Sequence, residues 1–119
     1  KDKDPKRGLD QKIIDNNYRV LKRIAQILEK FRDYNVTIEG HANNISGTEE
    51  EETSRANGNI PLVPLSQERA QTVKSILASY GISASRLTTV GRGGRMPVAA
   101  HSDKDNWWKN RRVEFILNK

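Results

Sequence analysis

The apolar residues of this 119-residue chain follow two different spacings, and the order of these spacings limits the folds open to it. From Asp10 they recur at steps of three and four, which predicts an amphipathic helix ending near Arg32. The stripe consists of Ile14, Tyr18, Leu21, Ala25 and Leu28, widened by Ile24 and Phe31. Val36 and Ile38 then alternate with polar neighbours, as in a half-buried strand over residues 36–41. One face of the helix is therefore expected to pack against this strand.

The second half of the chain repeats the same order. Ser66 is the predicted N-cap of a second helix, and Gly81 supplies its C-terminal stop. The apolar stripe of this helix is Ala70, Val73, Leu77 and Tyr80. It is the most sharply bounded element in the sequence.

Two more strands complete the pattern, and the last one is expected to pair inside the same sheet. They are predicted at 87–90 and at 112–117, with a turn at 91–94 and a helical turn at 103–110. On the last strand, Val113, Phe115 and Leu117 share one face. This order of elements predicts an α+β fold, a mixed sheet with helices packed on one face. The start of the second helix, the turn at 91–94 and the segment 42–65 should then meet at one end of the sheet.

The segment 42–64 shows neither a helical stripe nor an alternation, so it is predicted to be a long loop. A loop of this length in a compact domain is usually functional or disordered. Its four consecutive glutamates, 49–52, are most simply a solvated acidic stretch. The alternative is that one of them supplies an anion to a binding pocket.

Length and composition favour one domain at 10–119, preceded by a charged linker at 1–9. The chain contains no cysteine and no apolar run near the ~20 residues of a membrane span, so neither thiol chemistry nor membrane insertion of this domain is expected. The net charge of +6 is spread along the chain and accompanies no recognised nucleic-acid motif. Nucleic acid is therefore not an expected partner.

Catalysis is not expected either, and no cofactor or metal is predicted. The two histidines, His41 and His101, do not stand at metal-ligand spacing. His41 ends a strand, where hydrogen bonding to its own loop is more common than a catalytic role. Ser66 is not part of a nucleophile elbow.

Two arginine positions are more informative. If Ser66 is the N-cap, Arg69 falls in the first helical turn, where the helix dipole disfavours a cation. Together with the free N–H groups of that turn, its guanidinium could bind a carboxylate. An arginine that points to solvent or pairs with a loop glutamate is an equally weighted alternative. Arg111 lies on the same side of the last strand as its apolar residues, so it is expected at the rim of the end of the sheet where the loops meet. Solvated arginines at a strand start are at least as common. Trp107 and Trp108 are interpreted as a lid over the core rather than a ligand platform.

Four stretches, in this order and spacing, resemble the OmpA-like family, which includes peptidoglycan-associated lipoproteins and the periplasmic part of flagellar stator proteins. They are Ile38 to Asn43, similar to I-x-G-H-T-D; Leu65 to Val73, similar to L-S-x-x-R-A-x-x-V; Gly81 to Pro97; and Asn110 to Glu114, containing N-R-R. The resemblance implies a β-α-β-α-β fold whose first strand is missing or degenerate within residues 1–9 and belongs upstream. It also implies noncovalent binding of the peptidoglycan stem peptide.

The resemblance further implies the site residues Asn43, Arg69, Asn110 and Arg111, with His41 and Ser66 as further candidates. In the family, the aspartate of G-H-T-D accepts the ammonium of the diamino acid, and the arginine of L-S-x-x-R-A takes a carboxylate. Arg69 matches, but the aspartate position holds Asn43, which predicts at least tenfold weaker binding because hydrogen bonds to charged groups are stronger. Other departures are Leu62 in place of an asparagine, Asn106 and Trp107 in place of Gly-Arg, and a longer loop after Asn43.

The leading hypothesis is a module that anchors an envelope protein to the cell wall in the periplasm of a diderm bacterium, attached to or near the outer membrane through sequence outside this piece. A second hypothesis is a diverged scaffold that has lost wall binding and contacts other envelope proteins. A third is a pocket retuned to a wall whose diamino acid lacks the second carboxylate.

Overall fold

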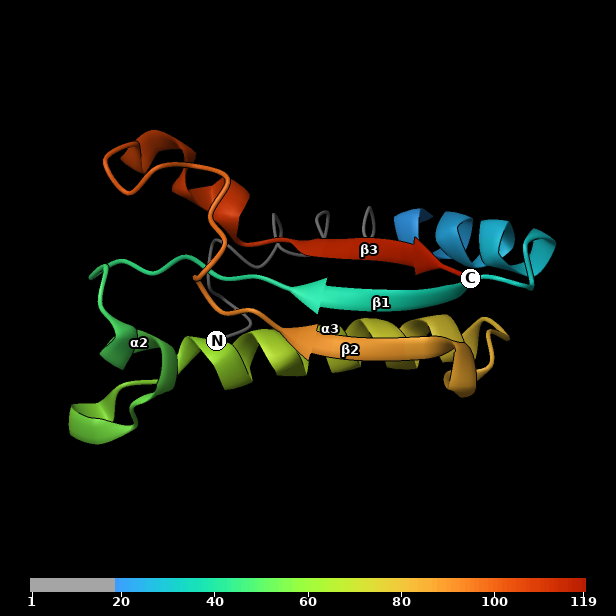
Figure 1. The fold of residues 1–119 in the computed structure, drawn as a ribbon, viewed down its shortest axis with the longest axis horizontal. Coiled ribbons are helices and arrows are strands. Elements are labelled where there is room, and N and C mark those ends of the chain that lie inside the picture. Colours follow the sequence, from blue (N-terminus) through green and yellow to red (C-terminus); the bar gives the residue numbers. More distant parts are fainter. Residues whose placement is uncertain (1–18) are drawn as a thin grey trace, which may run out of the picture.

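The computed structural model describes residues 19–119, which form one mixed sheet with helices packed against it (Figure 1). The predicted linker at 1–9, the family's first strand, and the first turns of the helix from Asp10, with Ile14 and Tyr18, lie outside these residues. The described helix at 19–30 is followed by β1 (Asn35–Gly40), α2 (Glu49–Thr53), α3 (Leu62–Ser79), β2 (Leu87–Gly91) and β3 (Val113–Asn118). Single 3-10 segments lie at Ala56–Gly58, Ala84–Arg86 and Lys104–Asn110, the last confirming the predicted helical turn.

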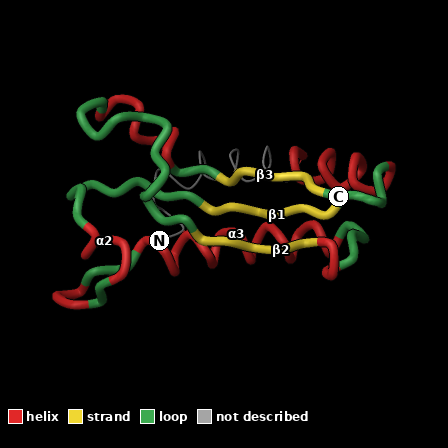
Figure 2. The backbone as a smooth tube through the Cα atoms, viewed as in Figure 1, coloured by secondary structure: helices red, strands yellow, loops and turns green. Residues whose placement is uncertain are grey.

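The three described strands are arranged in the order β2-β1-β3 (Figure 2). β1 pairs in parallel with β2, so that Gly40 lies opposite Gly91, and antiparallel with β3, so that Ile38 lies opposite Phe115. α3 makes the crossover between the parallel pair and lies behind β2 in Figure 1. The mixed sheet and the pairing of the last strand inside it are therefore confirmed.

The core lies between the sheet and the two long helices. Its buried members are Leu21, Ala25, Leu28, Val36, Ile38, Ala70, Leu77, Ile82 and Leu87. The central residues of both predicted helical stripes are among these buried residues, so the stripes are confirmed there. Burial of apolar surface drives this packing. The predicted stripe is wrong at its margin, since Phe31 follows the last helical residue and is 52% exposed.

The start of α3 differs from the prediction. The helix begins at Leu62 with Pro61 as its N-cap, so Ser66 is an interior residue and its prediction as the N-cap is wrong. Proline is tolerated at a helix start because the first N–H groups have no helical partner. Arg69 consequently lies well inside the helix, and the expected cluster of free first-turn N–H groups beside it is not formed.

The segment 42–64 is not a continuous loop, because it contains α2. Thr48 caps this helix by accepting a hydrogen bond from the Glu51 N–H, and glutamates fill the first turn, where the helix dipole favours anions. The pattern Thr-x-x-Glu at 48–51 is the sequence feature that would have predicted it. The acidic run is thus folded against the domain rather than solvated throughout.

Candidate functional site

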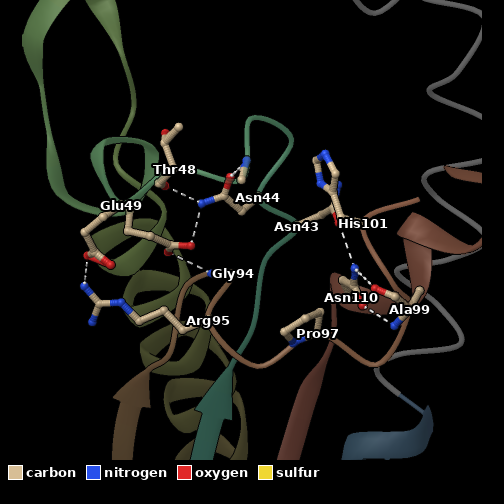
Figure 3. A pocket seen from close by; sticks show the side chains of 12 residues that line it. Asn43, Asn44, Thr48, Glu49, Gly94, Arg95, Pro97, Ala99, His101 and Asn110 are labelled. Atoms are coloured by element: carbon tan, nitrogen blue, oxygen red, sulfur yellow. Dashed lines mark hydrogen bonds and ion pairs between the residues drawn. The ribbon is translucent and has the colours of Figure 1, made fainter. Parts of the chain in front are cut away.

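A pocket of about 270 Å³ lies beyond the ends of β1 and β2, where the sequence predicted that the loops would meet. Parallel strands bring their carboxyl ends to the same edge of a sheet, which places the segments after β1 and β2 side by side. Figure 3 shows Glu49 and Arg95 on one side of the pocket and Ala99, His101 and Asn110 on the other. The remaining lining residues are Asn43, Asn44, Gly47, Thr48, Glu52, Gly94 and Pro97.

Asn110 fixes one wall of the pocket. It is 2% exposed, and its Oδ1 accepts hydrogen bonds from the backbone N–H groups of Val98 and Ala99, both at 2.8 Å. Its Nδ2 donates to Oδ1 of Asn43 at 2.8 Å and to the carbonyl of Ala99 at 3.2 Å. Because two backbone donors fix which end of the Asn110 amide is oxygen, they also fix the amide of Asn43.

This orientation leaves the other end of the Asn43 side chain unsatisfied. Asn43 is 8% exposed, and its Nδ2 has no hydrogen-bond partner among the described residues. A buried donor without a partner is uncommon and costs about 1–3 kcal/mol. The residue at the family's aspartate position therefore presents an unused donor instead of an anionic acceptor.

Glu52 forms the opposite wall and is the buried one of the two carboxylates that line the pocket. Although it is only 3% exposed, its hydrogen-bond partners are neutral: Gly94 N–H donates to Oε1 at 2.9 Å and Asn44 Nδ2 to Oε2 at 2.8 Å. Asn44 is itself held by the carbonyl of Thr48 at 2.8 Å. A Cβ at position 93 or 94 would overlap this wall, which explains the two glycines there.

Two further glutamates of α2 have different partners. Glu49 pairs with Arg95 at 2.6 Å on the surface. Glu51 accepts hydrogen bonds from the backbone N–H groups of Ile45 and Ser46 at 3.0 and 2.7 Å. Burial acts to raise the pKa of Glu51, but these hydrogen bonds outweigh it and hold the pKa below its usual value. Glu51 thus fastens the loop, while Glu52 and Glu49 face the pocket.

A second buried polar cluster lies beside the pocket but does not line it. Glu39 is 5% exposed; its Oε1 lies 3.3 Å from His41 Nε2 and its Oε2 accepts from Arg92 at 3.0 Å. Glu114 is paired with Arg112, whose hydrogen bond holds the pKa of Glu114 below its usual value. The His41 nitrogen and the two carboxylates lie within 4.8 Å of one another, the spacing of a metal site, but each carboxylate already has a guanidinium partner. The nearby positive charge disfavours a cation there.

Of the sequence-predicted site residues, the structure brings together Asn43 and Asn110. His41 and Ser66 are buried and do not line the pocket; Ser66 instead accepts a hydrogen bond from Gly93 N–H at 2.8 Å. Arg69 and Arg111 line a separate hollow with Arg112 and apolar residues of α3 and β3.

The prediction that both tryptophans cover the core is wrong: Trp108 is 60% exposed, and Trp107 packs on His101 at 5.5 Å. The pocket residues that sequence reasoning missed are Asn44, Arg95 and His101. No local pattern marks them.

The model of the OmpA family matches residues 10–111. The peptidoglycan-binding protein ArfA of Mycobacterium tuberculosis is 34% identical over 106 residues, 89% of this chain and 29% of that protein. The peptidoglycan-associated lipoprotein of Brucella suis is 35% identical over 98 residues, 82% of this chain and 52% of that protein. The chain therefore corresponds to only a part of each relative.

Solved structures match the fold as well. The peptidoglycan-associated lipoprotein from Burkholderia pseudomallei is 26% identical with a TM-score of 0.70, covering 87% of this chain and 79% of that one. A MotB-like protein from Desulfovibrio vulgaris is 28% identical with a TM-score of 0.69, covering 85% and 60%. The α+β fold with a three-stranded mixed sheet and helices packed against it is the fold of these domains.

Proposed function

The chain belongs to the OmpA family, and from that premise we propose that it is a noncovalent peptidoglycan-binding module that anchors an envelope protein to the cell wall. The observation that carries the proposal is the pocket at the end of the sheet, where the two family positions Asn43 and Asn110 meet at 2.8 Å. Relatives named for peptidoglycan binding or association support it. No catalytic step is part of the proposal.

The size and chemistry of the pocket favour a stem peptide over a sugar chain. At about 270 Å³ it is small compared with the ~300–1,000 Å³ of typical ligand sites, so it suits the end of one side chain. Its lining offers carboxylates, amides and one guanidinium, groups that bind amines and carbonyls. The diamino acid of a stem peptide presents such groups.

Arg69 and Arg111 stay in the proposal as carboxylate contacts. They line a different hollow from Asn43, which makes their contribution separable from that of the pocket by mutation. Each guanidinium can bind both oxygens of a carboxylate.

The proposed location is the cell envelope, in the periplasm, with outer-membrane attachment through other sequence. Among the described residues, none of the helices combines the length and apolar character needed to cross a membrane.

Sedimentation of the purified domain with sacculi tests the proposal. The wild-type domain should co-sediment, Arg69→Ala should weaken binding, and Arg23→Ala, an exposed arginine on the helix at 19–30, should serve as an unaffected control. On a wall with a free diamino acid centre, Asn43→Asp should strengthen binding about tenfold, because it places a charged acceptor for the amine at position 43. Failure of the wild type to sediment with any purified sacculus would exclude the function.

The alternative is a scaffold that contacts other envelope proteins. It is favoured by one observation: position 43 holds a neutral asparagine instead of the family's aspartate, and its Oδ1 already accepts a hydrogen bond from Asn110. Sacculi that differ in stem-peptide chemistry separate the two functions, because a scaffold binds none of them and a retuned pocket binds one kind.

A further inference from the structure

Glu52 is a buried carboxylate whose charge has no partner of opposite sign in hydrogen-bonding contact among the described residues. Its two oxygens accept from Gly94 N–H and Asn44 Nδ2, which are neutral. Arg95 is the guanidinium in the pocket, but it pairs with Glu49 at 2.6 Å. Buried charges in proteins are normally paired or bind a cation, so this one is suited to a cationic ligand.

An independent observation on the other wall also indicates a ligand. Asn43 lines the same pocket, and its buried Nδ2 has no hydrogen-bond partner in the part of the chain described by the structure. The Asn110 hydrogen bonds prevent the amide from turning its oxygen to this position. A hydrogen-bond acceptor on a ligand, such as a carbonyl oxygen, would satisfy it.

The charges around the pocket favour an amine over a zwitterion. The lining contains two carboxylates, Glu49 and Glu52, and one guanidinium, Arg95. Since Arg95 is engaged by Glu49, the pocket keeps an excess negative charge at Glu52 and no unengaged guanidinium for a carboxylate. A ligand with an ammonium group at Glu52, a separate carbonyl oxygen that reaches Asn43 on the opposite wall, and no carboxylate beside the ammonium fits this arrangement.

We propose that Glu52 accepts the ammonium group of the stem-peptide diamino acid, in the role that an aspartate at position 43 would otherwise have. This inference rests on the proposed function and names the residue and the ligand group. The amine acceptor has moved from the strand end to α2, while Asn43 donates to a carbonyl of the same ligand. Lysine-type diamino acids, whose side-chain amine has no neighbouring carboxylate, are the preferred class.

The test uses two soluble tripeptides of the stem-peptide type that share L-Ala-γ-D-Glu and end in L-lysine or meso-diaminopimelate. Each is titrated into 15N-labelled protein, with the amide resonance of Gly94 as the reporter because this N–H donates to Glu52. The wild type should bind the lysine peptide more tightly and shift the Gly94 resonance. Acetylation of the lysine ε-amine should abolish binding, a readout that needs no variant protein.

Variants assign the effect to one carboxylate. Glu52→Gln should weaken binding of the lysine peptide at least tenfold, the effect expected when a charge-assisted hydrogen bond is lost. Glu50→Gln is the matched control on the same helix, with an exposed side chain, and should stay within about twofold of the wild type. Adding Asn43→Asp to Glu52→Gln should restore binding only in part, because it returns a carboxylate to the pocket but removes the Asn43 donor.

The outcomes separate the inference from the proposed function. If the wild type sediments with sacculi but Glu52→Gln and the acetylated peptide bind as well as their parents, wall binding stands and the role of Glu52 is overturned. If the lysine peptide binds through Glu52 but intact sacculi are not bound, the inference stands and anchoring fails. If neither peptides nor sacculi bind, both are overturned.

Discussion

Two carboxylates are almost equally buried in this domain, but their surroundings differ. Glu39, 5% exposed, lies on β1 with Arg92 at 3.0 Å and His41 at 3.3 Å. Glu52, 3% exposed, lies on the five-residue helix α2 and has only neutral donors, Asn44 and Gly94. The first charge is paired with a guanidinium within the fold, whereas the second has no cation in hydrogen-bonding contact among the described residues.

The difference follows from what each residue is attached to. Glu39 is fixed in the centre of the sheet, opposite Val90 on one side and Glu114 on the other. Glu52 lies on the short helix α2 outside the sheet and is held by hydrogen bonds to Asn44 and Gly94. A carboxylate with its own cation stabilises a fold when its geometry is good, whereas one without a cation lowers stability and is retained when binding requires it.

The largest expected effect on stability comes from removing the Asn110 side chain, whose hydrogen bonds hold one wall of the pocket. Asn110→Ala should lower the free energy of unfolding by about 3 kcal/mol or more, since it leaves the N–H groups of Val98 and Ala99 and the Asn43 amide without partners. Urea unfolding monitored by circular dichroism measures this. Asn106→Ala, which removes one hydrogen bond to Asp103, should change it by less than about 1 kcal/mol. Equal effects of the two variants would mean that Asn110 does not organise the pocket.

The next effect tests the paired carboxylate. Glu39→Gln should lower the free energy of unfolding by about 2 kcal/mol, because it weakens hydrogen bonds of a charged group to Arg92 and His41. Peptide binding by the folded variant should be unchanged, since Glu39 does not line the pocket. A loss of binding without a loss of stability would remove the distinction between the two carboxylates.

A smaller effect concerns the attachment of the loop and depends on pH. The folded pKa of Glu51 is below its ordinary value of 4.5, so its contribution to stability is present above that value and is lost as the pH falls through the folded pKa. Glu51→Gln should therefore cost about 1 kcal/mol at pH 7 and progressively less below pH 4.5. Unfolding midpoints between pH 7 and pH 3 provide the measurement, with Glu50→Gln as control. A difference that stays constant with pH would contradict the assignment.

The smallest expected effect on stability belongs to the unpaired carboxylate. Glu52→Gln should change the free energy of unfolding by no more than about 1 kcal/mol, because removal of a buried charge without a hydrogen-bonded cation offsets the loss of one of the two hydrogen bonds that the carboxylate accepts from Gly94 and Asn44. Thermal unfolding compared directly with Glu39→Gln gives the contrast. A destabilisation as large as that of Glu39→Gln would mean that Glu52, like Glu39, stabilises the fold, and would contradict the difference between the two carboxylates.

The periodic parts of the fold were predictable because their burial is encoded locally. Val36 and Ile38 marked β1, and Ala70 and Leu77 marked the buried face of α3, where the observed burial agrees. The start of α3 was missed because Ser66 resembles a cap, whereas its side chain makes a tertiary hydrogen bond to Gly93. Sequence preference and tertiary contact competed there, and the contact prevailed.

The pocket was predictable in place but not in composition. Asn43 and Asn110 were identified, yet their direct hydrogen bond depends on how residues 67 positions apart meet. Glu52 was one of four equivalent glutamates in the sequence, and only the folding of α2 against Gly94 distinguishes it. Such selection among identical neighbours arises from long-range geometry, which no local pattern contains.

The position of α2 has a consequence for how the domain can diversify. Residues 44–60 form one wall of the pocket, yet none of them belongs to the hydrophobic core cluster. Substitutions and length changes in this segment are therefore expected to alter the pocket while the hydrophobic core stays the same. If the proposed binding is correct, grafting the segment between related domains should transfer part of their ligand preference.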